Sequence, residues 1–146
     1  MKDNIQEEII EEFAMFDDWL DKYDYLISLS ESLPVITPEH KTDLYLIEGC
    51  QSRVWVDARM DGDKIQYSAD SDAIIIKGLL ALLIRAMGNR TPQEVVDLDL
   101  YFIDAIGLKE NLSPTRGNGL VATIKQMREY AGVFNNVGRL LQTEHQ

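Results

Sequence analysis

The sequence predicts an α+β protein in which helices at both ends of the chain enclose a small antiparallel sheet. Apolar residues recur at helical spacing near the start, alternate with a two-residue period in the middle, and return to helical spacing after residue 71. The length of 146 residues suits one domain. We expect a two-layer sandwich, with a three-stranded antiparallel sheet carrying helices on one face, over residues 1–132, and a frayed, disordered tail over residues 133–146.

The first part of the chain predicts two helices joined to the sheet by a connector. The first helix follows from the spacing of Ile5, Ile9, Phe13 and Phe16. Asp17 or Asp18 can cap the second, which Pro34 ends. Two prolines in residues 34–41 are typical of a connecting loop.

The middle of the chain predicts three consecutive strands. Residues 44–47 alternate, and so do residues 54–60, where Val54, Val56, Ala58 and Met60 share one face. Asp61-Gly62-Asp63 is a tight turn, after which Ile65 and Tyr67 begin the third strand. Short connections between strands favour an antiparallel meander with one covered face.

The last part of the chain predicts helices that cover this sheet. Ser71 or Asp72 can cap an apolar helix over residues 73–87. Thr91-Pro92-Gln93-Glu94 combines a cap residue, a proline at the first helical position and a capping-box glutamate. Two further short helices are expected, at residues 100–106 and 119–130.

Composition and charge narrow the classes of function. The formal net charge of −11 argues against nucleic acid or an anionic membrane surface as partner, and favours another protein. No secretory signal or membrane-spanning run is visible. A single cysteine makes no internal disulfide and suits a reducing compartment, so we expect a cytoplasmic location.

Metal-site chemistry is restricted by the same composition. One cysteine with His40 and His145 cannot supply the ligand set of a structural zinc or iron–sulfur site. We expect both histidines to be solvated surface residues.

The single cysteine, Cys50, lies between two strand-like runs rather than within one. A lone cysteine is commonly a small buried hydrophobe. Here Gly49 permits a sharp turn just before it, and Gln51 and Ser52 are typical of a loop. A hydrolytic nucleophile would need a histidine base, whereas a thiol that receives a sulfur atom needs no base on its own chain.

The reactivity of this thiol depends on how readily it ionises. Arg53 and Arg116 are candidate cations that would favour the thiolate. An apolar environment would act in the opposite direction and raise the pKa. Which effect is larger is left open by the sequence.

Four segments resemble the SufE family of sulfur acceptor proteins: EGCQSRVW, ADSDAIIIKGLLALL, TPQEVV and NLSPTRGNGL. The resemblance implies a fold similar to that of the iron–sulfur scaffold protein IscU. It implies that Cys50 takes a persulfide sulfur from a SufS-like cysteine desulfurase, activates that enzyme, and passes the sulfur to a SufBCD-like scaffold complex. No cofactor of its own is implied, because the pyridoxal phosphate is on the desulfurase. The protein would be an accessory rather than a stand-alone enzyme.

The resemblance also suggests which residues surround the acceptor. Arg116 matches an arginine in the family's S/T-P-x-R turn, on a loop, and Asp72 falls in a segment that the family places near the acceptor, although an N-cap explains it equally well. Contacts with the partner or the thiol are further expected from Gly49, Gln51, Ser52 and Arg53. We also expect apolar side chains to shelter Cys50 at rest.

Three alternatives stay open at this point. One is an iron–sulfur scaffold, for which the cysteines are too few. The others are a cysteine hydrolase and an interaction module that binds a desulfurase through an inert Cys50. The particular desulfurase, the downstream scaffold and the oligomeric state, a homodimer included, are not specified by the sequence.

Overall fold

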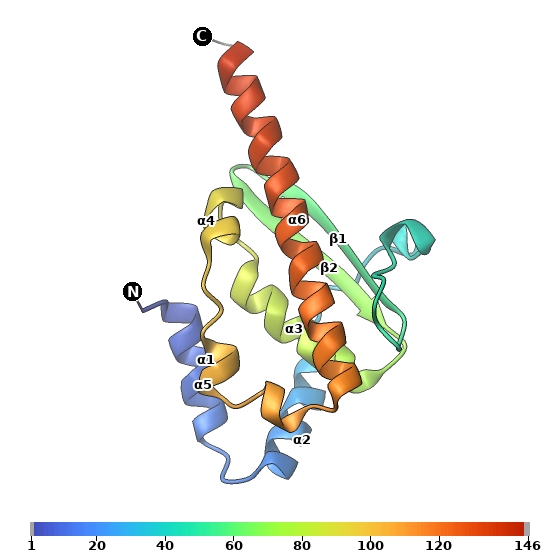
Figure 1. The fold of residues 1–146 in the computed structure, drawn as a ribbon, viewed down its shortest axis with the longest axis vertical. Coiled ribbons are helices and arrows are strands. Elements are labelled where there is room, and N and C mark those ends of the chain that lie inside the picture. The colour runs from blue at the N-terminus through green and yellow to red at the C-terminus, as the bar shows by residue number, and fades with distance from the viewer. Residues whose placement is uncertain (1, 145–146) are drawn as a thin grey trace.

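The computed structural model describes residues 2–144 of the chain, and side chains as far as residue 140. Its main elements are shown in Figure 1. In chain order they are α1 (Asn4–Ala14), α2 (Trp19–Leu29), β1 (Val54–Asp61), β2 (Lys64–Ser71), α3 (Ile74–Met87), α4 (Pro92–Asp97), α5 (Phe102–Ala105) and α6 (Pro114–Glu144). Short 3₁₀ turns lie at Ser30–Ser32, Pro38–His40, Asp43–Tyr45 and Lys109–Asn111.

Helix starts follow the capping residues of the sequence. The Asp18 carboxylate accepts a hydrogen bond from the Asp21 N–H at 2.9 Å, which fixes the start of α2. Thr91 and Glu94 form the expected capping box at α4, where each side chain accepts from the other residue's N–H. Local hydrogen bonds of this kind depend on neighbours in the chain, and therefore the sequence predicted them correctly.

The sheet has two strands, so the prediction of three was wrong. β1 and β2 pair antiparallel from Val54 opposite Ser71 to Asp61 opposite Lys64. The expected first strand is reduced to one bridge, between Leu46 and Trp55. Its other residues form the 3₁₀ turn, where the Tyr45 N–H bonds to the Thr42 carbonyl oxygen at 3.0 Å and is not available to a neighbouring strand.

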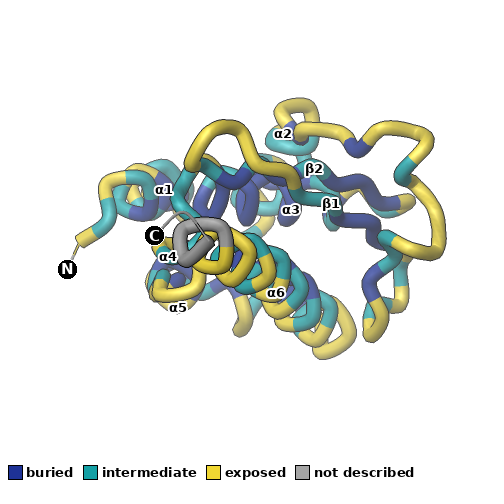
Figure 2. Tube along the Cα trace, turned by 90° about the horizontal axis from the view of Figure 1, so that it is seen from above, coloured by how far each residue is buried: buried dark blue, intermediate teal, exposed yellow. Residues whose placement is uncertain are grey.

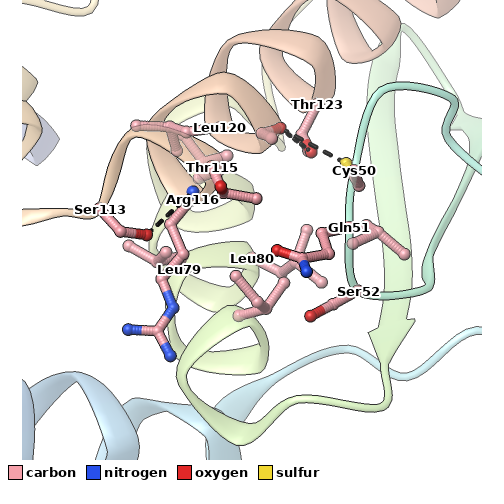
Figure 3. A pocket seen from close by; sticks show the side chains of 14 residues that line it. Cys50, Gln51, Ser52, Leu79, Leu80, Ser113, Thr115, Arg116, Leu120 and Thr123 are labelled. Atoms are coloured by element: carbon pink, nitrogen blue, oxygen red, sulfur yellow. Dashed lines mark hydrogen bonds between the residues drawn. The ribbon is translucent and has the colours of Figure 1, made fainter.

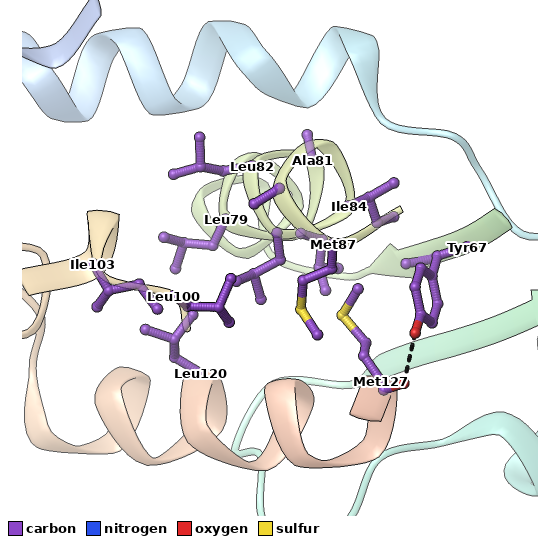
Figure 4. Close-up of a cluster of buried hydrophobic side chains, with 14 of the residues drawn as sticks. Tyr67, Leu79, Ala81, Leu82, Ile84, Met87, Leu100, Ile103, Leu120 and Met127 are labelled. Carbon is purple, nitrogen blue, oxygen red and sulfur yellow. Dashed lines mark hydrogen bonds between the residues drawn. The ribbon is translucent and has the colours of Figure 1, made fainter. Parts of the chain in front are cut away.

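The covered face of the sheet carries the side chains predicted from the alternation. Val54 and Val56 are buried on this face, and so are Ile65, Tyr67 and Ala69 of β2. Both α3 and α6 pack here, and Figure 4 shows their side chains interdigitating. The buried Tyr67 hydroxyl donates to the Met127 carbonyl oxygen at 2.6 Å, which ties the sheet to α6. Burial along the tube is greatest through α3 and the two strands (Figure 2).

The opposite face is covered in part by the connector rather than by a helix. The His40 ring stacks on Tyr45, and its Nδ1 lies 2.6 Å from the Asp57 carboxylate. The His40 side chain is 46% exposed, so it lies at the surface as expected but has an acidic partner that the sequence did not reveal. His145 lies outside the described residues.

The last helix is much longer than predicted. α6 begins at Pro114, where the Ser113 Oγ accepts from the Arg116 N–H at 3.3 Å, and continues to Glu144. The described part of the expected frayed tail, residues 133–144, continues this helix, and its Asn135 and Arg139 side chains donate to the Gln93 side-chain oxygen of α4. Its C-terminal end projects past the rest of the fold (Figure 1). Arg116 therefore lies in the first helical turn, and its expected loop position was wrong. The glycines within α6 weaken helix propensity, but packing of the helix against α4 and β1 stabilises it.

Candidate functional site

Cys50 lies in a loop, residues 48–53, that leads into β1; we call it the Cys50 loop. Gly49 has a φ of 90°, a left-handed conformation that glycine adopts without strain, and it turns the chain just before the thiol. The Ile47 N–H bonds to the Val54 carbonyl oxygen at 2.8 Å and closes the base of the loop. The predicted turn is therefore present.

The thiol of Cys50 is directed at the first half of α6 (Figure 3). Its Sγ lies 3.7 Å from the Gly119 carbonyl oxygen, within range of a weak S–H hydrogen bond. A Cβ at position 119 would lie only 3.4 Å from this sulfur, so glycine there lets the loop approach the helix closely. Cys50 is half-buried, which agrees with the expectation of a sheltered resting thiol.

A cavity of about 390 Å³ opens beside the thiol. Helix α3 supplies most of its apolar wall, and the Cys50 loop and the start of α6 supply polar groups. It is lined by Cys50, Gln51, Ser52, Val54, Ile76, Leu79, Leu80, Leu83, Ser113, Thr115, Arg116, Gly119, Leu120 and Thr123. A half-enclosed space of this kind can hold a small group attached to the sulfur away from bulk water.

The pKa of Cys50 is raised, mainly because burial disfavours the charged thiolate. The Thr123 hydroxyl, a hydrogen-bond donor beside the sulfur, acts in the opposite direction and lowers the pKa. Figure 3 shows the Arg116 guanidinium pointing away from Cys50, although Arg116 lines the same cavity. In this conformation, therefore, burial is the larger of the two effects that the sequence left open.

Asp72 and Ser71 hold the Cys50 loop instead of capping α3. The Asp72 carboxylate accepts from the Arg53 N–H at 3.2 Å, and the Ser71 hydroxyl donates to the Arg53 carbonyl oxygen at 2.7 Å. The cap position of α3 is Ala73, with no side-chain cap. The interpretation of Ser71 or Asp72 as a helix cap was therefore wrong, because both side chains bond to the loop that folds back beside them.

The remaining predicted residues separate into two groups. Gln51 and Ser52 line the cavity with Cys50, whereas the exposed Arg53 does not line it. Sequence reasoning missed Gly119, whose carbonyl oxygen faces the thiol, and Thr123, whose hydroxyl donates to that same oxygen. A signal was present, because Thr123 follows Leu120 by three residues and so is a polar residue on the helix face predicted to point inward.

In the part of the chain that the structure describes, no three histidine, cysteine or acidic side chains come together as a metal site requires. Within the same residues, no helix is long and apolar enough to cross a membrane.

Comparison with known proteins gives consistent results. The model of the SufE family, described as Fe-S metabolism associated domain, matches residues 7–131. An uncharacterised SufE-like protein of Rhizobium etli is 38% identical over 132 residues, covering 87% of this chain and 89% of the relative. One of Synechocystis is 36% identical over 126 residues, covering 86% and 79%.

The fold is also shared with a solved structure. The solution structure of a hypothetical protein from Thermus thermophilus superposes with a TM-score of 0.74 at 22% identity, covering 90% of this chain and 96% of that one. The fold agrees, the family model spans most of the chain, and three of the four segments that carried the resemblance contribute to the cavity beside one thiol. This chain belongs to the SufE family, the Fe-S metabolism associated domain.

Proposed function

We propose that this protein accepts a sulfane sulfur on Cys50 from the persulfide of a cysteine desulfurase and delivers it to a scaffold that builds iron–sulfur clusters. The observation that carries the proposal is the position of the thiol, on a glycine turn and open to a cavity with an apolar wall. Membership of a family associated with Fe-S metabolism supports it. The reaction needs one thiol, and the chain contains one cysteine.

The transfer step is a thiol–disulfide-type exchange. The Cys50 thiolate attacks the outer sulfur of a donor cysteine persulfide, R–S–SH, and a new S–S bond forms as the donor's S–S bond breaks. The donor sulfur leaves as a thiolate with the bonding electron pair, and Cys50 carries the S–SH group. No net oxidation or reduction takes place. Removing the sulfur frees the donor enzyme for another turnover, so the protein would also activate the desulfurase.

Burial of Cys50 fits a carrier that must not react between partners. A raised pKa keeps the resting thiol neutral and therefore a poor nucleophile toward oxidants. The cavity beside the sulfur leaves space for one additional sulfur atom. Docking of the desulfurase would then expose the Cys50 loop, and Arg116, whose guanidinium points away from the thiol at rest, would contact the partner.

Mass spectrometry of sulfur transfer tests the proposal directly. The full chain is incubated with a cysteine desulfurase and free cysteine, and the peptides are then mapped without reductant. We expect the mass of one extra sulfur on the Cys50 peptide and faster cysteine turnover by the desulfurase. Cys50→Ser should fold and bind but carry no sulfur.

The result that would overturn the proposal is a wild-type chain without extra sulfur although the desulfurase itself is loaded. Anaerobic incubation with iron and sulfide separates the scaffold alternative, since a scaffold would acquire stable visible absorbance from a bound cluster. Desulfurase activation that survives in Cys50→Ser would instead support an interaction module.

A further inference from the structure

Thr123 is a buried polar residue that has no part in the proposed sulfur-transfer step. Its side chain is 3% exposed and lies in α6 on the wall of the Cys50 cavity. The Thr123 hydroxyl donates to the Gly119 carbonyl oxygen at 2.8 Å, and the Cys50 thiol is directed at the same oxygen from 3.7 Å. Figure 3 shows the Cys50 and Thr123 side chains close together beside α6. One acceptor thus has two side-chain donors.

This arrangement changes when the thiol ionises. The thiolate has no proton to donate, and its negative sulfur faces the Gly119 carbonyl oxygen, which is also an acceptor. The hydroxyl of Thr123, already bonded to this oxygen, carries a proton that can lie between the two acceptors. A helix carbonyl keeps the N–H four residues further on as its partner, so the Gly119 oxygen does not depend on the hydroxyl.

We propose that Thr123 is a positioning residue for Cys50, whose hydroxyl turns from the Gly119 carbonyl to the sulfur once the sulfur is anionic. The same bond would hold the persulfide anion in the cavity after transfer, a part of the proposal that rests on the proposed function. A hydrogen bond to an ionised group is roughly twice as strong as one between neutral groups, which favours this rearrangement. Only the hydroxyl proton changes its acceptor, and no covalent bond is involved.

The charged groups around Cys50 are not placed to stabilise its thiolate, so we assign this role to Thr123. Among the side chains that line the cavity in the described residues, Arg116 of α6 is the charged one, and it points away. Arg53 and Asp72, from the Cys50 loop and the β2–α3 connection, are bonded to each other through the Arg53 N–H. Thr123 is the hydrogen-bonding group that lowers the Cys50 pKa against the effect of burial.

A structural role is the competing explanation, because threonine hydroxyls in helices commonly bond to the carbonyl four residues earlier. The pH dependence of Cys50 alkylation by iodoacetamide separates the two. The midpoint of the rate profile reports ionisation of the thiol, and its plateau at high pH reports access to the sulfur. A purely structural change moves the plateau or the melting temperature but leaves the midpoint in place.

The variants are Thr123→Val, which keeps the shape and removes the hydroxyl, and Thr123→Ser, which keeps the hydroxyl. Thr115→Val is the matched control, since Thr115 lines the same cavity without a side-chain hydrogen bond in the described structure. We expect Thr123→Val to lower the alkylation rate near pH 7 by about tenfold with an unchanged plateau. Thr123→Ser and Thr115→Val should stay within about twofold of the parent protein.

A Thr123→Val midpoint equal to that of Thr115→Val would overturn the proposal. If Thr123→Val does not fold, the midpoint is measured on Thr123→Ala, which also lacks the hydroxyl. Transfer from a loaded desulfurase should slow by the same factor in the valine variant. A parent protein that never acquires sulfur would refute the proposed function, while the alkylation midpoints would still decide the role of Thr123.

Discussion

Gly78 and Gly119 each allow a neighbouring segment to pack closely against a helix, but the two neighbouring segments differ in how firmly they are held. A Cβ on Gly78 of α3 would lie 2.1 Å from the Leu26 carbonyl oxygen of α2, a backbone atom within the core. A Cβ on Gly119 of α6 would lie 3.4 Å from the Cys50 Sγ, a side chain on a loop beside a cavity. The first contact joins two core helices, whose separation would expose buried apolar side chains. The second joins a helix to a loop that buries little.

A rigid helical core and a more weakly held loop allow this protein to stay folded while it exposes the Cys50 thiol. Helices α2 and α3 pack closely and bury Leu26 and Leu80 almost completely. The Cys50 loop is held by a few hydrogen bonds to Arg53 and by the base of the loop. Regions with few buried contacts open at lower free energy than the core, so we expect the loop to open while the helices stay folded.

The largest effect is expected from Gly78→Ala. The new methyl group would overlap a backbone oxygen, and the strain should exceed the helix-propensity gain of about 1 kcal/mol. We expect a loss of about 2 kcal/mol or more in the free energy of unfolding, measured by urea denaturation. Gly132→Ala is the control, because nothing lies within 4 Å of its Cβ. Equal stability of the two variants would contradict the close packing of α2 and α3.

A smaller effect is expected from Asp72→Ala, which removes the carboxylate that accepts from the Arg53 N–H. This hydrogen bond is exposed, so the free energy of unfolding should fall by only about 0.5 kcal/mol. Alkylation of Cys50 should nevertheless become several times faster, because the loop loses an anchor. Asp24→Ala, an exposed change on α2, should alter neither quantity. An unchanged alkylation rate would show that Asp72 does not restrain the loop.

Gly119→Ala should alter stability still less. The helix-propensity gain of about 1 kcal/mol opposes crowding against the Cys50 sulfur, and we expect the two to cancel within about 0.5 kcal/mol. The sulfur should move outward, and therefore the alkylation plateau at high pH should rise. Gly117→Ala has open space around its Cβ and should leave the plateau unchanged. A stability loss as large as that of Gly78→Ala would remove the distinction between the two contacts.

The smallest effect concerns the pH dependence of stability. Burial raises the Cys50 pKa in the folded protein above its value in the unfolded chain. The neutral thiol's contribution to stability is therefore fully present below the unfolded pKa and is lost as pH rises through the folded pKa. Unfolding measured between about pH 7 and about pH 10 should show a steeper loss for the parent protein than for Cys50→Ser. Parallel curves would mean that the thiol is not desolvated.

Local features of the fold could be predicted from the sequence, and pairings between distant segments could not. The caps at Asp18 and Thr91 and the hairpin turn at Gly62 depend on residues next to one another. The third strand failed because Leu44 and Tyr45 alternate in sequence like a strand but close a 3₁₀ turn. The length of α6 was underestimated because propensity, lowered by its glycines, does not include the packing of the helix on α4 and β1.

The sequence by itself determined the family, the α+β class and the position of Cys50 on a turn after Gly49. These follow from motifs and periodicities written along adjacent residues. Only the tertiary structure decided that the thiol lies beside Gly119 and Thr123, because Cys50 and Gly119 are separated by 69 positions in the sequence. The pKa of a thiol depends on the water removed from it and on the donors brought to it, and both are supplied here by a distant helix.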